Sequence, residues 1–163
     1  MIKKAKKIGS LKISQIHTGI LVLENKTIFK GVGIGYQGTA TGEVCFNTSL
    51  TGYQEIISDP SYAGQIINFT FPHIDNVGTN NEDLESDNVW TKGVIFNSEI
   101  TSPSNYRSFV HLDLWLKKNK IVGITGLDTR SLTNFIRDKG APKGTISFSK
   151  KGNFNISKLA NIT

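Results

Sequence analysis

The sequence predicts an α+β domain in which a strand-rich first half is followed by helices, as in a layered β/β/α arrangement. Up to residue 96, apolar residues come in short β-branched runs or alternate with polar residues, which is typical of strands. From Phe109 onward they recur at spacings of three and four, which is typical of amphipathic helices. This order of elements, with short connections, favours an α+β domain over a doubly wound sheet.

The first expected element is a β-hairpin. The apolar runs 19–23 and 28–32 flank the polar stretch 24–27, in which Asn25 suits a turn. Pro72 is expected to end a later strand. Further strands are expected at 44–48, 65–71, 94–96, 121–124 and 145–148.

Two amphipathic helices are expected in the second half. The first has Ser108 as a possible cap, and its apolar residues are Phe109, Leu112, Trp115 and Leu116. The second is expected to begin at Asp128 and to end at Gly140, with an apolar face made of Leu132, Phe135 and Ile136. Arg137 and Lys139 lie near its C-terminal end, where the helix dipole favours cations.

Composition and length narrow the class of protein. A chain of 163 residues with 37% hydrophobic residues can form one domain with its own core. A single cysteine, Cys45, excludes an internal disulfide and is typical of the cytosol. No apolar run is long enough for a membrane span, and the N-terminus lacks the pattern of a secretory signal. We therefore expect a soluble, cytoplasmic protein with no membrane partner.

The net charge of +6 is concentrated at the N-terminus. Five lysines lie within the first 12 residues, which leaves 14 of the 19 basic residues against 13 acidic ones. Residues 1–18 are therefore expected to form a solvated basic tail on a nearly neutral body, 19–150. Because the body has no basic stripe with interleaved aromatic residues, no nucleic-acid partner is expected; a nucleic-acid binder that uses the lysine tail remains an alternative.

Two candidate sites lack a feature that their chemistry would require. The stretch 33–38 fits the dinucleotide pattern G-x-G-x-x-G, but a turn at 39–43 and then a strand are expected to follow, where a helix would be required. Cys45 would need a neighbouring histidine to act as a nucleophile. In the middle of a strand it is expected to pack, although a free-standing thiol enzyme remains an alternative.

No metal site is expected. His17, His73 and His111 are far apart in sequence and have no spacing typical of zinc ligands. The acidic run 82–87 lacks the spacing of a calcium-binding loop, and a solvated loop is the simpler interpretation.

Three polar strings remain after this survey, and together they resemble a known family. The strings are Gly42–Gln65, which contains GEVCFNTSLTGYQEI and DPSY, Pro72–Ser86, which contains PHI and GTNNEDLES, and Asp128–Gly144, which contains DTRSLT. They resemble the N-terminal domain of the small subunit of glutamine-dependent carbamoyl-phosphate synthase. The likeness covers about residues 19–148, with Asp75 where a glycine is common and no match before residue 19.

The resemblance implies a three-layer β/β/α "swivelling" domain in a larger assembly. In that family a following glutaminase domain releases ammonia from glutamine with a Cys–His–Glu arrangement. A separate large subunit uses ATP, Mg and bicarbonate to make carbamoyl phosphate for arginine and pyrimidine synthesis. Cys45 matches no catalytic position of the family, so no catalytic residue and no cofactor are expected in this chain. Residues 151–163 are expected to begin a linker to the glutaminase domain, which the 163 residues do not include.

One site residue carries over by position. Ser61 matches a family residue at the edge of the glutamine pocket, and glutamine, which carries an ammonium and a carboxylate, needs hydrogen-bonding partners. A plain turn cap is the alternative interpretation of this serine. The expected partners are the large subunit, the glutaminase domain of the same subunit and glutamine. Exposed aromatic residues near the shared strings, namely Tyr53, Tyr62 and Trp90, are candidates for partner contacts.

Overall fold

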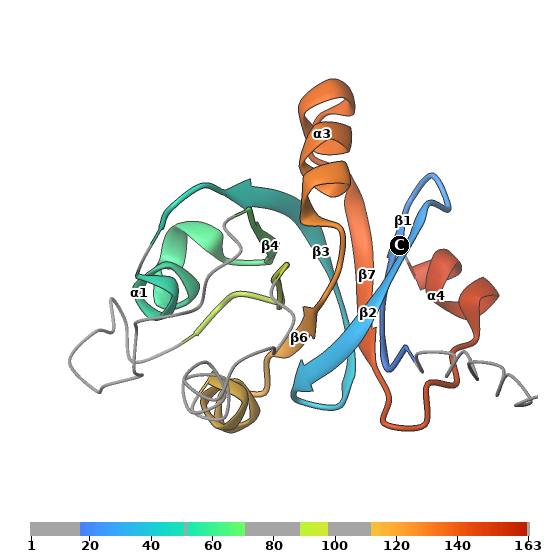
Figure 1. Cartoon of the computed structure of the whole chain (residues 1–163), viewed down its shortest axis with the longest axis horizontal. Helices are drawn as coiled ribbons and strands as arrows, with labels where there is room; N and C mark the ends of the chain where they lie inside the picture. Colours follow the sequence, from blue (N-terminus) through green and yellow to red (C-terminus); the bar gives the residue numbers. More distant parts are fainter. Residues whose placement is uncertain (1–16, 51, 71–88, 98–111, 163) are drawn as a thin grey trace, which may run out of the picture.

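The computed structural model describes residues 17–50, 52–70, 89–97 and 112–162, and these form a closed seven-stranded barrel with helices around it (Figure 1). Around the barrel the strands follow the order β1-β2-β6-β5-β4-β3-β7. The strands are β1 Gly19–Leu23, β2 Ile28–Gly35, β3 Gly38–Asn47, β4 Gln65–Phe69, β5 Gly93–Ile95, β6 Val122–Thr125 and β7 Lys143–Phe148. The helices are α1 Tyr53–Ser58, the 3-10 helix η1 Pro60–Tyr62, α3 Thr129–Lys139 and α4 Ile156–Ile162, and residues 112–118 are also helical.

The barrel combines parallel and antiparallel pairs. β3, β4, β5 and β6 run parallel to one another, whereas the pairs that involve β1, β2 or β7 are antiparallel. The predicted hairpin is confirmed, since β1 pairs with β2 from Gly19 opposite Gly31 to Val22 opposite Ile28. Its turn is held by Asn25, whose Oδ1 accepts a hydrogen bond of 3.0 Å from the Thr27 backbone N–H.

Most other predicted elements lie at or near their expected positions. β3 includes most of the predicted strand 44–48, but the turn predicted at 39–43 was wrong, because these residues pair with β7. Within the described residues β4 ends at Phe69, and the predicted cap Ser108 and the predicted first apolar residue Phe109 lie outside them. α3 begins as predicted, with the Asp128 side chain accepting from the Ser131 N–H at 3.0 Å, and it ends before Gly140, whose φ is 87°.

The strand alternation creates a core on each side of the barrel wall. Leu21 and Leu23 of β1 belong to the main cluster, which also takes side chains from five other strands and from Leu132 and Ile136 of α3. A second cluster, which includes Ile67 and Phe69 of β4, joins the strands to α1 and to the helical segment 112–118. In Figure 1, α1 and α3 lie against different parts of the barrel.

The C-terminal segment 151–163, predicted as the start of a linker, contains the helix α4. Leu159 of α4 is 7% exposed and packs against Ile20 and Val22 on the outer side of β1, with Phe154 beside them. The surrounding polar residues hide this contact in the sequence, since one buried leucine makes no visible apolar period. That the segment leads to a glutaminase domain stays a prediction, as does the three-layer "swivelling" arrangement.

Candidate functional site

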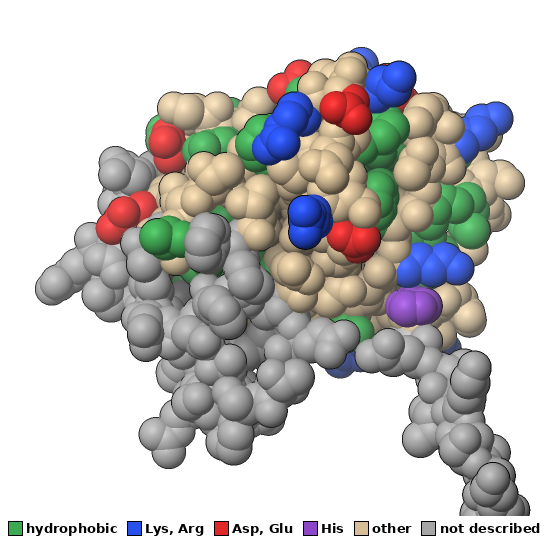
Figure 2. All heavy atoms as spheres, turned by 45° about the horizontal axis from the view of Figure 1, so that its top comes forward, with side chains coloured by type: hydrophobic (Ala, Val, Ile, Leu, Met, Phe, Trp, Pro, Cys, Tyr) green, Lys and Arg blue, Asp and Glu red, His purple; other side chains and the backbone are tan. Residues whose placement is uncertain are grey.

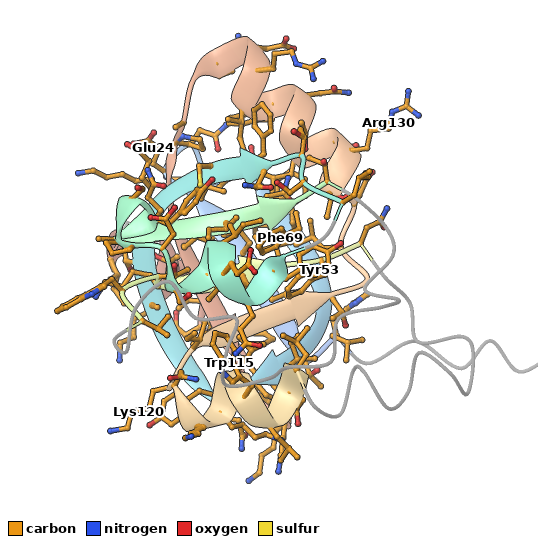
Figure 3. The ribbon with its side chains drawn as sticks, turned by 90° about the vertical axis from the view of Figure 1, so that its left-hand side faces the viewer. Glu24, Tyr53, Phe69, Trp115, Lys120 and Arg130 are labelled. Atoms are coloured by element: carbon orange, nitrogen blue, oxygen red, sulfur yellow. The ribbon has the colours of Figure 1, made fainter. Side chains whose placement is uncertain are left out.

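The candidate site is the connection between β3 and β4, which carries α1 and η1. Gly52 precedes α1 with a φ of 79°, a left-handed conformation that favours glycine. Figure 3 looks onto this side of the molecule, with α1 in front and the labelled Tyr53 and Phe69 next to it. The connection therefore lies on the outside of the barrel, next to the second core cluster.

Asn47 fixes both ends of this connection. Its side-chain Nδ2 donates to the hydroxyl of Tyr62 at 2.9 Å, and its Oδ1 accepts from the Ser49 N–H at 2.8 Å. Its backbone carbonyl accepts from the N–H of Thr70 at 3.1 Å and from the Thr70 hydroxyl at 3.2 Å. Asn47, at the end of β3, thus contacts the beginning of the connection, η1 and the end of β4.

Ser61 lies in the exposed 3-10 turn of this connection. Its backbone N–H donates to Asp59 Oδ1 at 2.8 Å, so Asp59 is the residue that caps the turn. The Ser61 side chain is exposed, and within the described parts of the chain its hydroxyl has no hydrogen-bond partner. A hydroxyl that lies exposed on a capped turn, with no partner among the described residues, is available to a ligand or to a neighbouring domain. Its place at the edge of a glutamine pocket stays a prediction.

The three aromatic candidates have different environments. Tyr53, predicted to be exposed, is 4% exposed: its ring packs edge-on against Phe69 at 4.9 Å and Phe96 at 5.8 Å. It opens a helix of six residues that lies on the core, so its ring points inward. Tyr62 is half-buried with its hydroxyl bound to Asn47. Trp90 is 54% exposed, as predicted.

The segment around Trp90 is joined to the same connection. The Trp90 carbonyl accepts from the Gly64 N–H at 3.2 Å, just after η1, and the Thr91 hydroxyl donates to the Ile57 carbonyl of α1 at 2.8 Å. Thr91 is buried, so this second bond is shielded from water. Trp90 and Ser61 therefore belong to one hydrogen-bonded unit.

Cys45 is a packed thiol and a poor nucleophile. It lies half-buried in β3, opposite Ile67, and contacts the second core cluster. Burial raises the pKa of the Cys45 thiol to about 11, and the neighbouring Glu43 carboxylate acts in the same direction. The thiolate is therefore rare at neutral pH. His73 and His111 lie outside the described residues.

The predictions about metal and dinucleotide sites can be compared with the described residues. Among the described residues, no group of three or more His, Cys, Asp or Glu side chains could hold a metal ion, and the acidic run 82–87 lies outside them. After Gly38 the chain continues as β3, where a dinucleotide site would require a helix. Gly33 is needed for close approach, because a side chain there would collide with the ring of Phe148.

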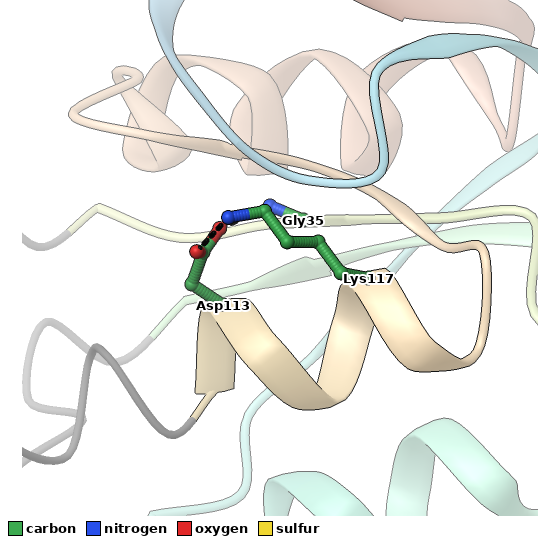
Figure 4. Close-up of polar contacts among 3 residues, drawn as sticks. All are labelled: Gly35, Asp113 and Lys117. Atoms are coloured by element: carbon green, nitrogen blue, oxygen red, sulfur yellow. Dashed lines mark hydrogen bonds and ion pairs between the residues drawn. The ribbon is translucent and has the colours of Figure 1, made fainter.

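Two polar residues that sequence reasoning missed hold helices to the barrel. Asn68 of β4 is fully buried, and its Nδ2 donates to the Thr129 carbonyl at 3.2 Å and to the Thr133 hydroxyl at 2.9 Å. This contact uses the side chain of Thr133 but only the backbone of Thr129. Asp113 accepts from the Gly35 N–H at 2.7 Å and pairs with Lys117 (Figure 4). Only the spacing of four between Asp113 and Lys117 was visible in the sequence.

Comparison with known proteins identifies the family. The family model described as "Carbamoyl-phosphate synthase small chain, CPSase domain" matches residues 21–146. Curated proteins named carbamoyl phosphate synthase small chain match over 146 residues, or 87% of this chain: the one from Bradyrhizobium diazoefficiens is 53% identical and that from Agrobacterium fabrum 52%. The chain belongs to the family of carbamoyl-phosphate synthase small chains.

The chain spans little more than a third of the length of these relatives, 37% of the Bradyrhizobium protein and 36% of the Agrobacterium protein. Among solved structures, an aminopeptidase from Aneurinibacillus sp. strain AM-1 aligns with a TM-score of 0.42 and 16% identity, over 80% of this chain and 30% of that one. A score this low does not define a common fold. In the described residues, no helix has the length and apolar character needed to cross a membrane.

Proposed function

We propose that the chain is the non-catalytic N-terminal domain of the glutaminase (small) subunit of carbamoyl-phosphate synthase. The observation that carries this proposal is the 53% identity to a carbamoyl phosphate synthase small chain over 146 residues, together with the family match over residues 21–146. In this role the domain supports the delivery of ammonia from glutamine to the large subunit. The large subunit binds ATP and Mg, and uses bicarbonate to make carbamoyl phosphate for arginine and pyrimidine synthesis in the cytoplasm.

The geometry of the connection between β3 and β4 supports a role in positioning. Asn47 and Asp59 hold the turn that carries Ser61, so the backbone that presents the exposed hydroxyl is held in place. A glutamine bound between this turn and a glutaminase domain would gain a hydrogen-bonding partner there. Such a domain contributes binding and shape, and the glutaminase domain contributes the nucleophile.

The state of Cys45 supports the assignment of hydrolysis to another domain. A cysteine nucleophile needs an accessible thiolate, which a base or a cation stabilises. The Cys45 pKa of about 11 places its thiol far from that state. The domain therefore acts in the ligase by assembly with the glutaminase domain and the large subunit.

Ammonia release from glutamine tests the non-catalytic role. The purified chain is incubated with glutamine and ammonia is measured with a coupled enzyme assay, beside the Cys45→Ala variant. We expect no release above the rate without protein for either chain. A rate that is present in the wild type and lost in Cys45→Ala would overturn the proposal.

A further inference from the structure

A hollow on the outer surface of the barrel lies between β1, β2 and the segment that leads into α4. Its volume is about 250 Å³, and the side chains that line it are those of His17, Ile20, Lys30, Phe154 and Ile156. In Figure 1, α4 lies on the opposite side of the barrel from α1. The hollow is therefore separate from the connection that carries α1 and η1.

Hydrogen bonds and packing hold the walls of this hollow together. The backbone N–H of Ser149 donates to the Thr18 carbonyl at 2.9 Å, and that of Gly152 donates to the Ser149 carbonyl at 2.9 Å. The turn that follows β7 is thus fixed to the start of β1. Leu159 of α4 is 7% exposed and packs on the outer side of β1. The hollow therefore belongs to the folded barrel and does not depend on a single loop.

The floor of the hollow is apolar, and nitrogen-bearing side chains lie at its edge. Ile20 is 1% exposed, and the half-buried Phe154 packs in the same small cluster. Lys30 lies directly opposite Ile20 in the pairing of β1 with β2, so both side chains are on the same face of the sheet. Figure 2 shows a histidine side chain, in purple, next to a blue Lys or Arg side chain at one edge of the molecule.

Among the described residues, no acidic side chain lines the hollow. The nearest acid along β1 is Glu24, four positions beyond Ile20, which corresponds to about 13 Å along a strand. Its carboxylate accepts from the backbone N–H of Lys143 at 3.3 Å, on the side of β7. Within the same described parts of the chain, neither Lys30 nor His17 forms an ion pair. The ammonium of Lys30 is therefore available to an anion from outside.

We propose that this hollow binds a small organic carboxylate. Its apolar body would lie on Ile20 and Phe154, and its carboxylate would accept hydrogen bonds from the Lys30 ammonium and the His17 imidazole. The volume is near the lower end of the range for ligand pockets, so a body the size of one ring fits. Because the ligand would touch both β1 and the segment before α4, its binding would also stabilise α4 on the barrel.

A titration followed by ¹H–¹⁵N NMR tests the proposal with benzoate as the probe. The full 163-residue chain is used, and the backbone amides of Gly19, Lys30 and Gly152 report on the hollow. Benzamide has the same ring without the charge, and acetate has the charge without the ring. We expect saturable shifts with a Kd on the order of 1 mM for benzoate, and binding at least about fivefold weaker for the other two compounds.

Variants separate the roles of charge and shape. Lys30→Met keeps an unbranched side chain but removes the ammonium, and should weaken benzoate binding at least about fivefold. Lys30→Arg should retain binding. The control Lys151→Met removes an exposed charge near the hollow but outside its lining, and should stay within about twofold of wild type. Thermal melts check that all three variants are folded.

Three results would overturn the proposal. The first is the absence of shifts in wild type up to about 20 mM benzoate, well above the expected Kd. The second is equal binding of benzoate by Lys30→Met and wild type, or of benzamide and benzoate by wild type, which would show that the hollow does not select an anion. The third is a set of shifts centred on residues outside the hollow. The proposed function requires no ligand here, so it stands whichever result is obtained.

Discussion

The carboxylate of Asp113 accepts a hydrogen bond of 2.7 Å from the backbone N–H of Gly35, a residue 78 positions earlier in the chain. Gly35 ends β2 with a φ of 71°, where a side chain would be strained and would also meet Leu116. Asp113 thus joins the helical segment 112–118 to the turn between β2 and β3 (Figure 4). The contact holds the helical segment against the end of β2.

Replacing Asp113 by alanine should destabilise the protein by about 1–3 kcal/mol, because the Gly35 N–H is left without its partner. The control Lys117→Ala removes only the ion pair, which is half exposed, and should cost less than about 0.5 kcal/mol. Urea unfolding of the two variants gives both values. Equal losses in the two variants would show that the ion pair, and not the bond to Gly35, holds the segment.

Replacing the buried Asn68 by alanine should cost about 2–3 kcal/mol. The Thr129 carbonyl and the Thr133 hydroxyl would lose a buried donor, and a cavity would remain between β4 and α3. Asn134→Ala, at an exposed position of the same helix, is the control and should be nearly neutral. Urea unfolding compares the two, and a neutral Asn68→Ala would contradict the role given to this contact.

Alanine variants of Tyr53 and Trp90 compare a buried aromatic residue with an exposed one. Truncating the buried Tyr53 to alanine should cost about 3–5 kcal/mol, because its ring fills the space beside Phe69 and Phe96. Truncating the exposed Trp90 should change the free energy of unfolding by less than about 0.5 kcal/mol. A large loss for Trp90→Ala in the isolated chain would show that this ring supports the fold and is not kept for a partner.

The raised pKa of Cys45 predicts both low reactivity and a pH effect. The folded thiol, with a pKa of about 11, should react with iodoacetamide at pH 8 much more slowly than the urea-unfolded chain, as followed by mass spectrometry. Because the folded pKa of Cys45 lies above the ordinary thiol value of about 9, the contribution of Cys45 to stability is complete below pH 9 and is lost as the pH rises toward 11. Cys45→Ala should remove that part of the alkaline decline. Rapid alkylation of the folded chain would contradict the packed thiol.

Local signals in the sequence predicted the local parts of the fold. Asn25 marked the hairpin turn, and Asp128 and Gly140 marked the two ends of α3, because turns and caps depend on neighbouring residues. The parallel pairing of β3 to β6 and the closure of the barrel depend on contacts between distant residues, which no local pattern encodes.

Only part of the candidate site could be predicted from the sequence, because the rest depends on contacts between distant residues. The resemblance predicted Ser61 at the edge of a glutamine pocket, which stays a prediction, and the structure adds that the turn of Ser61 is capped by Asp59 and linked to Asn47 through Tyr62. The burial of Tyr53 could not be predicted, because a single aromatic residue after a glycine gives no sign of the face on which it will pack. α4 was missed because its contact with the barrel depends mainly on Leu159.

The most direct test of the central claim is whether the 163-residue chain binds a carbamoyl-phosphate synthase large subunit. Isothermal titration of the chain into the large subunit of Bradyrhizobium diazoefficiens should give saturable binding with one chain per large subunit and a Kd of about 10 μM or tighter, as for a specific interface. The absence of binding at about ten times that concentration, with both proteins folded, would contradict the account.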